Sequence, residues 1–386
     1  MSTFDIFLTG VFVVTQAHIA RLLTRAAARR WKGPALRRVW WAVGLFEIAV
    51  FCCYMLSYSD LAASIGLGGT GAQVVGAMAI AYLLVSAPAA VLWTAATTAG
   101  RRFSRDPDPR RRLMLRTAGA ALIAGPTAAL GYGYVKRLDF HVRELDIPLR
   151  DLPRDLDGLR ILQISDIHLG PFLSERDLTR VVDAACGIPA HLAMITGDLI
   201  SSPGDPLDAC IRQLARVKAD AGVFGCMGNH ERYARVENYT EQAAARVGIR
   251  FLRSRHVPLR FGGAVLNLAG VDHQSHAGHK PYLPGAERMI VPGAFNLLLS
   301  HNPDVFPVAA RQGYNFMLSG HTHGGQVTVE ILNQSINPAR FFTPYVYGLY
   351  RIGGAAAYVT RGIGTIGIPT RIGAPPEISV VRLRKA

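Results

Sequence analysis

Residues 316–326 read FMLSGHTHGGQ, a short apolar run followed by glycines and two histidines. An apolar run of this length that ends at Gly320 predicts a buried β-strand, which stops just before His321 and His323. In an α/β sheet, ligands bind at the carboxyl ends of strands, because the loops that leave there converge on one crevice. This stretch therefore predicts a ligand site at the end of a buried strand.

Four other predicted strands end in the same way. Asp166 and His168 follow residues 159–165, Asp198 follows 192–196, Asn229 and His230 follow 222–227, and His301 follows 295–300. Carboxylates, an amide and imidazoles in one cleft suit Mn, Fe or Zn better than Mg or Ca, which prefer oxygen ligands. Because these side chains are more numerous than the ligands of one ion, we expect two divalent metal ions that share a carboxylate. Such a pair can clamp a phosphoryl group.

The region around these motifs alternates short apolar runs with helical patterns from Asp146 onward, which predicts one α/β domain over residues 144–386. The predicted strands are residues 159–165, 192–196, 222–227, 264–271, 295–300, 316–319, 355–360 and 378–383. The predicted helices are residues 175–185, 207–218, 240–247 and 305–312. A domain of this size can bury a core on its own.

Taken in order, the motifs Asp-x-His, Gly-Asp, Gly-Asn-His-Glu, His and Gly-His-x-His resemble the signature of the calcineurin-like metallophosphoesterase superfamily. The stretch at 320–326 and the tail at 361–364 and 375–378 are similar to its YkuE/YaeI-like bacterial branch. The resemblance implies a four-layer sandwich, in which two mixed β-sheets are flanked by helices and a dimetal site lies on one edge. It also implies a dimetal phosphohydrolase, a phosphodiesterase in preference to a monoesterase.

The resemblance further implies a role for each motif residue. Asp166, His168 and His323 would bind the first ion, Asp198 would bridge, and Asn229, His301 and His321 would complete the second. A metal-bound hydroxide would attack the phosphorus, and His230 would act as general acid toward the leaving oxygen. Glu231 is expected to orient a histidine, and Asn302 to be structural. Because His168 and His323 must be neutral to bind metal, activity should fall as imidazoles protonate.

Two segments near the motifs allow alternative interpretations. His273, His276 and His279 lie with Asp272 in a Gly- and Pro-rich segment, where a solvated loop is favoured over substrate contact. The second segment is aromatic, and it would be either a lipid-facing lip or a packed cluster. Its residues are Phe341, Phe342, Tyr345, Tyr347 and Tyr350.

The first 143 residues differ from the rest in hydropathy and in charge. Four apolar runs, at about 4–20, 39–57, 74–99 and 113–135, approach the length of about 20 residues that a membrane-spanning helix needs. Residues 1–143 carry 17 basic and 6 acidic side chains, against 25 and 21 in residues 144–386. We therefore expect a membrane domain of about four transmembrane helices. The net charge of +15 then reports orientation in a bilayer, and no nucleic-acid partner is expected.

Arginine-rich segments indicate which way these helices run. Residues 21–38 and 101–116 are rich in arginine, whereas residues 58–73 contain no basic residue. The positive-inside rule places the basic segments in the cytoplasm, and a fourth crossing would put the catalytic domain on the extracytoplasmic side of the cell membrane. With three crossings the domain would be cytoplasmic. Arg110, Arg111 and Arg112 also resemble a twin-arginine export signal, or form a basic helix flank.

Three functional hypotheses follow. The first is a membrane-anchored, metal-dependent phosphoesterase that acts on a lipid- or envelope-associated phosphoester. The second is a pyrophosphatase of a nucleotide-linked lipid such as UDP-2,3-diacylglucosamine, which is a cytoplasmic substrate. The third is a non-catalytic membrane scaffold or sensor that keeps the metal site as part of its fold.

Overall fold

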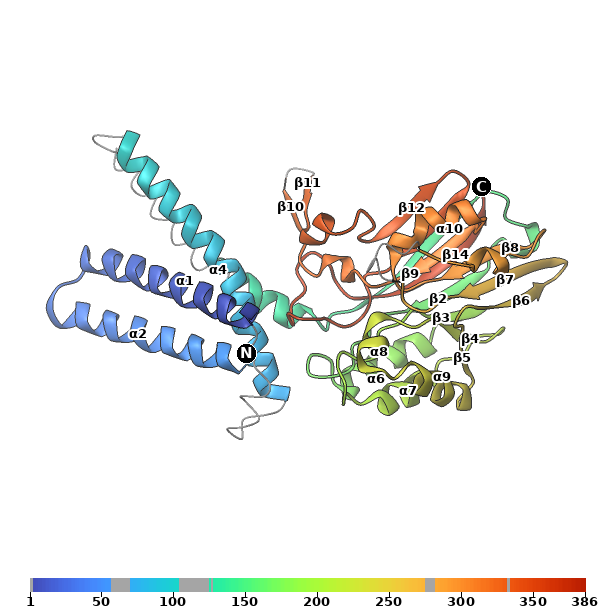
Figure 1. Cartoon of the computed structure of the whole chain (residues 1–386), viewed down its shortest axis with the longest axis horizontal. Coiled ribbons are helices and arrows are strands. Elements are labelled where there is room, and N and C mark those ends of the chain that lie inside the picture. Colours follow the sequence, from blue (N-terminus) through green and yellow to red (C-terminus); the bar gives the residue numbers. More distant parts are fainter. Residues whose placement is uncertain (1–2, 57–69, 104–124, 126–127, 275–281, 332–333) are drawn as a thin grey trace. The chain divides into compact units, whose positions relative to one another are not determined.

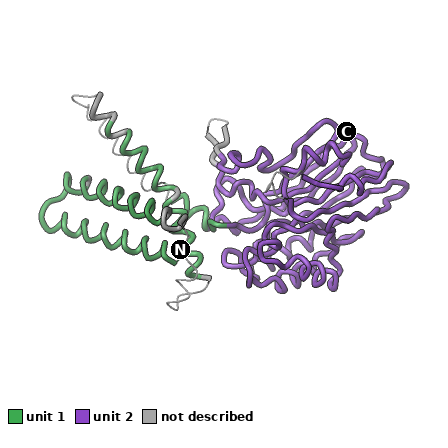
Figure 2. Tube along the Cα trace, viewed as in Figure 1, with its two compact units in different colours: residues 1–134, 367–369 green, residues 135–366, 370–386 purple. Residues whose placement is uncertain are grey.

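The computed structural model describes residues 3–56, 70–103, 125, 128–274, 282–331 and 334–386 (Figure 1). These residues divide into two compact units. One unit comprises residues 1–134 and 367–369, and the other comprises residues 135–366 and 370–386 (Figure 2).

The first unit is helical. Three of its helices have described bounds, α1 (Thr3–Ala28), α2 (Gly33–Met55) and α4 (Thr70–Phe103), and residues 128–134 are helical as well. The rings of Phe12 in α1 and Tyr54 in α2 are buried and stack with their centroids 4.3 Å apart. His18 Nε2 lies 2.7 Å from Thr94 Oγ1, which links α1 to α4. Aromatic packing and a side-chain hydrogen bond thus join α1 to α2 and to α4.

The expected number of membrane-spanning helices was wrong for the described part of the chain. Two helices there are long and apolar enough to cross a membrane, residues 33–55 and 71–95, and they match the second and third predicted runs. The first predicted run lies within α1, where Gln16, His18 and Arg21 interrupt the apolar sequence. Most of the fourth run, 113–135, lies outside the described residues.

The second unit contains two six-stranded mixed sheets. The strand order of the first sheet is β1 (His141–Leu149), β14 (Glu377–Lys385), β2 (Arg160–Ile164), β3 (Leu192–Ile195), β4 (Val223–Gly225) and β5 (Ile249–Phe251). The order of the second is β12 (Gly348–Ile352), β13 (Ala355–Val359), β9 (Phe316–Ser319), β8 (Phe295–Leu299), β7 (Ala264–Gly270) and β6 (Arg255–Phe261). A hairpin of β10 (Val329–Ile331) and β11 (Gln334–Ile336) stands apart from both.

Helices cover the outer face of each sheet (Figure 1). On the first sheet they are α6 (Glu175–Cys186), α7 (Leu207–Leu214), α8 (Asn229–Ala234) and α9 (Glu237–Arg246), and α10 (Phe306–Gln312) covers the second. Short 3₁₀ turns complete the unit: η1 (Arg154–Leu156), η2 (Ala286–Met289), η3 (Pro303–Val305), η4 (His323–Gly325) and η5 (Pro338–Phe341).

The core between the sheets is apolar and buried. Ile161 and Phe224 of the first sheet pack in one cluster with Leu268 and Leu297 of the second. Fully burying such a side chain contributes about 1.5–3 kcal/mol. The expected sandwich of two mixed sheets flanked by helices is confirmed, and each of the eight predicted strands forms.

Strand direction positions the polar motifs. In the first sheet β2, β3 and β4 are parallel neighbours, and in the second β7, β8, β9 and β13 are parallel. Their carboxyl ends therefore carry the loops that hold the motif histidines and aspartates.

Candidate metal centre

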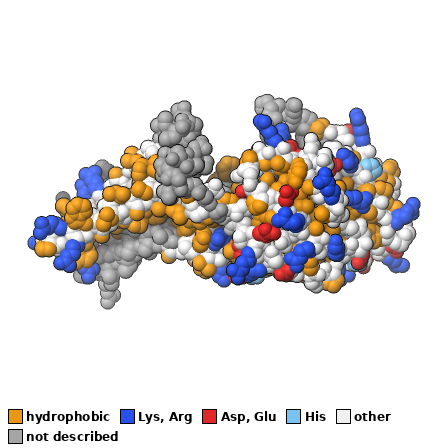
Figure 3. Space-filling view, turned by 90° about the horizontal axis from the view of Figure 1, so that it is seen from below, with side chains coloured by type: hydrophobic (Ala, Val, Ile, Leu, Met, Phe, Trp, Pro, Cys, Tyr) orange, Lys and Arg blue, Asp and Glu red, His pale blue; other side chains and the backbone are white. Residues whose placement is uncertain are grey.

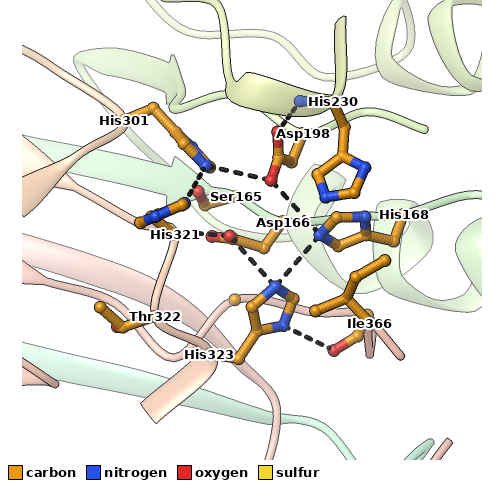
Figure 4. A network of polar contacts seen from close by, with 12 residues as sticks. Ser165, Asp166, His168, Asp198, His230, His301, His321, Thr322, His323 and Ile366 are labelled. Atoms are coloured by element: carbon orange, nitrogen blue, oxygen red, sulfur yellow. Dashed lines mark hydrogen bonds and ion pairs between the residues drawn. The ribbon is translucent and has the colours of Figure 1, made fainter. Parts of the chain in front are cut away.

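The motif side chains converge in a network of imidazoles around two aspartates (Figure 4). Three groups each place their nitrogen and oxygen ligand atoms within 4.8 Å of one another. The groups are Asp166, His168 and His323; His168, Asp198 and His230; and Asp198, His301 and His321. Because neighbouring groups share a member, the three form one continuous site.

Two pairs of imidazole nitrogens face one another at short range. His168 Nε2 lies 3.1 Å from His323 Nε2, and His301 Nε2 lies 3.1 Å from His321 Nδ1. Asp198 Oδ2 lies between these pairs, 3.4 Å from His168 Nε2 and 3.0 Å from His301 Nε2. A carboxylate placed between two sets of nitrogen donors is positioned to be shared by two cations.

Two buried oxygen atoms of the site indicate whether divalent ions would fit there. Asp166 Oδ2 and Asn229 Oδ1 are buried and have no hydrogen-bond partner within the described ranges. Leaving such an atom unpaired costs about 1–3 kcal/mol. A cation bound beside the imidazoles would remove that cost, so the donor set fits nitrogen- and oxygen-liganded divalent metal ions.

The backbone is strained at these positions. Asp166, His168, Asp198, His321 and His323 all have positive φ, at 52°, 49°, 54°, 76° and 53° respectively. Left-handed backbone is uncommon for residues other than glycine, and it tends to cluster at functional sites. Close packing adds a further constraint, because a Cβ atom on Gly228 would lie 2.1 Å from Asp198 Oδ1.

Glu231 has a different role from the one expected. Its carboxylate accepts hydrogen bonds from the backbone N–H groups of Asp198 (3.0 Å), Leu199 (2.6 Å) and Gly228 (2.7 Å). The expectation that Glu231 orients a histidine was therefore wrong. It instead ties the loop after β3 to the start of α8 and so fixes Asp198 and Asn229.

His230 is held by backbone contacts. Its backbone N–H donates to Asp198 Oδ1 at 2.9 Å, and its Nδ1 lies 2.5 Å from the carbonyl oxygen of Ser201. Donation from Nδ1–H to that carbonyl leaves Nε2 as the nitrogen that can take up or deliver a proton. The ring stands edge-on to His168 at a centroid distance of 4.7 Å, so it lies at the site.

Comparison with known proteins identifies the family. Residues 159–325 match the Calcineurin-like phosphoesterase model. The chain is 31% identical over 281 residues to the uncharacterized metallophosphoesterase YkuE of Bacillus subtilis (strain 168), a match that covers 71% of this chain and 97% of YkuE. This chain belongs to the calcineurin-like phosphoesterase family. As a member, it is a metal-dependent phosphoesterase with buried His and Asp metal-binding groups.

Other members of the calcineurin-like phosphoesterase family are also similar. A transmembrane protein with metallophosphoesterase domain from Danio rerio is 33% identical over 64% of this chain and 57% of its own length. An uncharacterized metallophosphoesterase of Aquifex aeolicus (strain VF5) is 27% identical over 66% of this chain and 95% of its own length.

The charges at the site of this calcineurin-like phosphoesterase are uneven. Burial lowers the pKa of His168 to about 3 and that of His321 to about 4. Burial would also lower the pKa of His301, but the Asp198 carboxylate outweighs it and raises that pKa to about 10. His301 in turn holds the pKa of Asp198 well below its usual range, against the opposing effect of burial. Without metal, His301 and Asp198 therefore form an imidazolium–carboxylate pair beside the neutral imidazoles of His168 and His321.

Arg371 supports the site, although it belongs to none of the sequence motifs. Its side chain is buried, and its guanidinium donates to the carbonyl oxygens of His323 (3.0 Å), Arg361 (2.9 Å) and Gly364 (3.1 Å). Burial lowers its pKa to about 10, so it stays charged at neutral pH. In the sequence, Arg371 is one arginine in a Gly- and Pro-rich tail, and only an alignment of relatives could single it out.

His273 lies at the site, so the expected solvated loop is wrong at this residue. Its ring centroid is 5.5 Å from that of His321 and 6.0 Å from that of His301. The other two histidines of that segment, His276 and His279, lie outside the described residues.

The aromatic segment divides into packed and exposed side chains, and the lipid-facing interpretation stays a prediction. Tyr345 packs on Phe306 and on Tyr350, with ring centroids 5.9 and 5.0 Å apart, as a packed cluster would. Phe341 and Phe342 are 88% and 89% exposed.

Proposed function

We propose that this calcineurin-like phosphoesterase hydrolyses phosphodiesters at a dinuclear metal site, in a chain anchored in the membrane by α2 and α4. The observation that carries the proposal is the position of Asp198 Oδ2, 3.4 Å from His168 Nε2 and 3.0 Å from His301 Nε2. A single carboxylate there can serve both ions and offset their mutual repulsion.

The proposed ligands follow the two outer groups of the site. Asp166, His168 and His323 would hold one ion, Asn229, His301 and His321 the other, and Asp198 both. Two divalent cations bound there would polarise the phosphoryl oxygens and lower the pKa of a bound water to near neutrality. Metal analysis of the purified chain should find Mn, Fe or Zn at two ions per protein.

His230 is proposed to protonate the leaving oxygen of the ester. The carbonyl of Ser201 fixes Nδ1–H, so the proton would leave from Nε2 of the protonated ring. Asp198 Oδ1 accepts a hydrogen bond from the backbone N–H of His230 at 2.9 Å, which keeps the imidazole close to the ligand groups. The proposed preference for diesters rests on the resemblance to the YkuE/YaeI-like branch.

Membrane anchoring is supported by the exposed apolar faces of the first unit. In α2, Trp41, Leu45 and Ile48 are 73%, 63% and 63% exposed, as expected for side chains that face lipid. Figure 3 shows apolar side chains along these helices and Lys and Arg side chains at the α1–α2 turn. We propose residues 1–143 as a membrane domain and 144–386 as the catalytic domain.

The substrate is proposed to be a lipid- or envelope-associated phosphoester. Phe341 and Phe342 project from η5, and Asn337 holds this turn by donating from Nδ2 to the Gly324 carbonyl at 2.9 Å. Gly324 directly follows His323, so exposed aromatic side chains stand on a turn tied to the metal-binding loop. Apolar side chains on a rigid turn suit insertion at a membrane interface.

Hydrolysis by the full chain in lipid nanodiscs tests the catalytic part of the proposal. After loading with Mn, Fe or Zn, we expect bis-p-nitrophenyl phosphate to be cleaved faster than p-nitrophenyl phosphate. Asn229→Ala and His230→Ala should each lower kcat/KM at least about a hundredfold. The matched control Gln242→Ala, which removes an exposed amide side chain in α9, should not change the rate. If no metal-dependent hydrolysis occurs and neither variant has an effect, the result would favour a non-catalytic scaffold.

A reporter fusion tests the side of the membrane. We propose that the catalytic domain is extracytoplasmic, which requires residues 113–135 to cross the bilayer. Alkaline phosphatase fused after Arg150 should then be active. An inactive fusion, with an active cytoplasmic fluorescent reporter at the same point, would place the domain in the cytoplasm and favour a nucleotide-linked lipid as substrate.

A further inference from the structure

His273 reaches the metal centre because of strand pairing. It follows β7, whose Gly270 pairs with Leu299 of the parallel neighbour β8. The two loops that leave these strands therefore start side by side, one bearing His273 and the other His301. Their ring centroids are 6.0 Å apart.

Neighbouring residues hold the His273 backbone on both sides. On one side, Arg253 clamps Asp272 through Nε at 2.9 Å and Nη2 at 2.9 Å. On the other, Asn302 Nδ2 donates to the Gln274 carbonyl at 2.7 Å. Asn302 directly follows His301, so one side chain couples the position of His273 to that of a proposed metal ligand. A loop fixed in this way presents its side chain in a defined place.

The imidazole of His273 lies just outside the ligand groups. It belongs to none of the three groups formed by the described residues, whereas the rings of His301 and His321 are 4.9 Å apart. Its Nδ1 is buried and has no hydrogen-bond partner in the described part of the chain. A buried imidazole nitrogen without a partner is costly, and a ligand in the site would satisfy it.

We propose that His273 binds the phosphoester substrate by donating an imidazole N–H to a phosphoryl oxygen on the His301–His321 side of the site. A neutral imidazole always has one N–H to donate, so the contact needs no change of protonation. His230 lies beside His168, 4.7 Å between ring centroids, so the two non-ligand histidines contact different ligand histidines. The inference rests on the proposed function, because it assigns a substrate contact in that same site.

The test measures binding of inorganic phosphate to the Mn-loaded full chain in nanodiscs by titration calorimetry. His273→Phe keeps a ring but has no N–H, and His273→Asn restores a donor. We expect His273→Phe to weaken phosphate binding about ten- to a hundredfold and His273→Asn to recover most of it. The KM for bis-p-nitrophenyl phosphate should rise in parallel with little change in kcat. Bound Mn should stay at the wild-type stoichiometry.

Controls separate this role from folding and from metal binding. His256→Phe is the matched control, because His256 is an exposed histidine on β6 that hydrogen-bonds Asn267 instead. If His273→Phe fails to fold by thermal unfolding, His273→Ala takes its place. Unchanged phosphate affinity in the folded variant, or loss of Mn along with phosphate, would overturn the inference. If phosphate binding depends on His273 but no ester is hydrolysed, the proposed function is contradicted. The inference that His273 contacts a phosphoryl oxygen is then still supported.

Discussion

Asp198 Oδ2 lies 3.0 Å from Nε2 of His301, and both side chains are buried, so each controls the charge of the other. The carboxylate raises the pKa of His301 to about 10, and the imidazolium lowers the pKa of Asp198. Without metal the pair is therefore an ion pair at neutral pH. A metal ion that takes the Nε2 of His301 must displace a proton from it.

Proton release should accompany metal binding. At pH 7.5 we expect about one proton to be released per protein when Mn binds, because His301 starts protonated while His168 and His321 start neutral. Calorimetric titrations in buffers of different ionisation enthalpy measure this number. The His301→Gln variant serves as control and should release none for this site. Binding without proton release in the wild type would contradict the assignment.

The stability of the metal-free protein should fall on both sides of neutrality. His168 and His321 have folded pKa values below the unfolded value of about 6.5, so their contribution is present above pH 6.5. It is lost as the pH falls toward 4 and 3, since only the unfolded chain takes up those protons. The folded pKa of His301 is raised, so its contribution is lost as the pH rises from 6.5 toward 10. Urea unfolding in the presence of a chelator at several pH values measures both losses of stability. A free energy of unfolding that is constant from pH 4 to 9 would contradict them.

Glu231→Gln should destabilise the fold and loosen the site. The carboxylate accepts three backbone N–H groups, and an amide NH₂ in place of one oxygen would face a donor with another donor. We expect a loss of about 2–3 kcal/mol in the free energy of unfolding, with reduced metal affinity. Denaturant unfolding and metal titration measure the two effects. Glu237→Gln, at the first turn of α9, should change stability by less than about 0.5 kcal/mol.

Arg371→Met should loosen the His323 loop, because it removes a direct hydrogen bond to the His323 carbonyl. The substitution leaves the carbonyl oxygens of His323, Arg361 and Gly364 without their buried donor. A destabilisation of about 3 kcal/mol is expected, and Arg371→Lys should not restore it, because an ammonium cannot span the same acceptors. Thermal unfolding is the measurement, with Arg384→Met on the partly exposed end of β14 as control. Wild-type stability in Arg371→Met would rule out this support.

Phe341→Ser and Phe342→Ser should separate membrane-associated from soluble substrates. The two side chains are 88% and 89% exposed, so removing them should not disturb packing. We expect a several-fold higher KM for a long-chain lipid phosphodiester in vesicles and an unchanged KM for bis-p-nitrophenyl phosphate. Leu349→Ser, at a side chain 41% exposed on β12, is the matched control. An equal loss on both substrates would argue against a lipid contact.

The main features of the sheets and the motifs could be predicted because their signals are local. Each predicted strand is a short apolar run closed by polar or glycine residues, and that pattern needs no knowledge of distant residues. The edge strands escaped prediction. Strand β1, for example, pairs with β14, and only the long-range register from His141 opposite Glu377 to Leu149 opposite Lys385 makes it a strand. Its alternation is interrupted by Pro148, which is tolerated because β1 lies at a sheet edge.

The sequence by itself determined which residue types stand at the strand ends, because apolar periodicity and turn residues are read within a few positions of one another. Only the tertiary structure decided what Glu231 and His273 contact. Glu231 reaches the backbone of Asp198 because β3 and β4 are parallel neighbours, and His273 reaches His301 because β7 and β8 are. Which strands become neighbours depends on burying both sheet faces at once, a property of the whole domain.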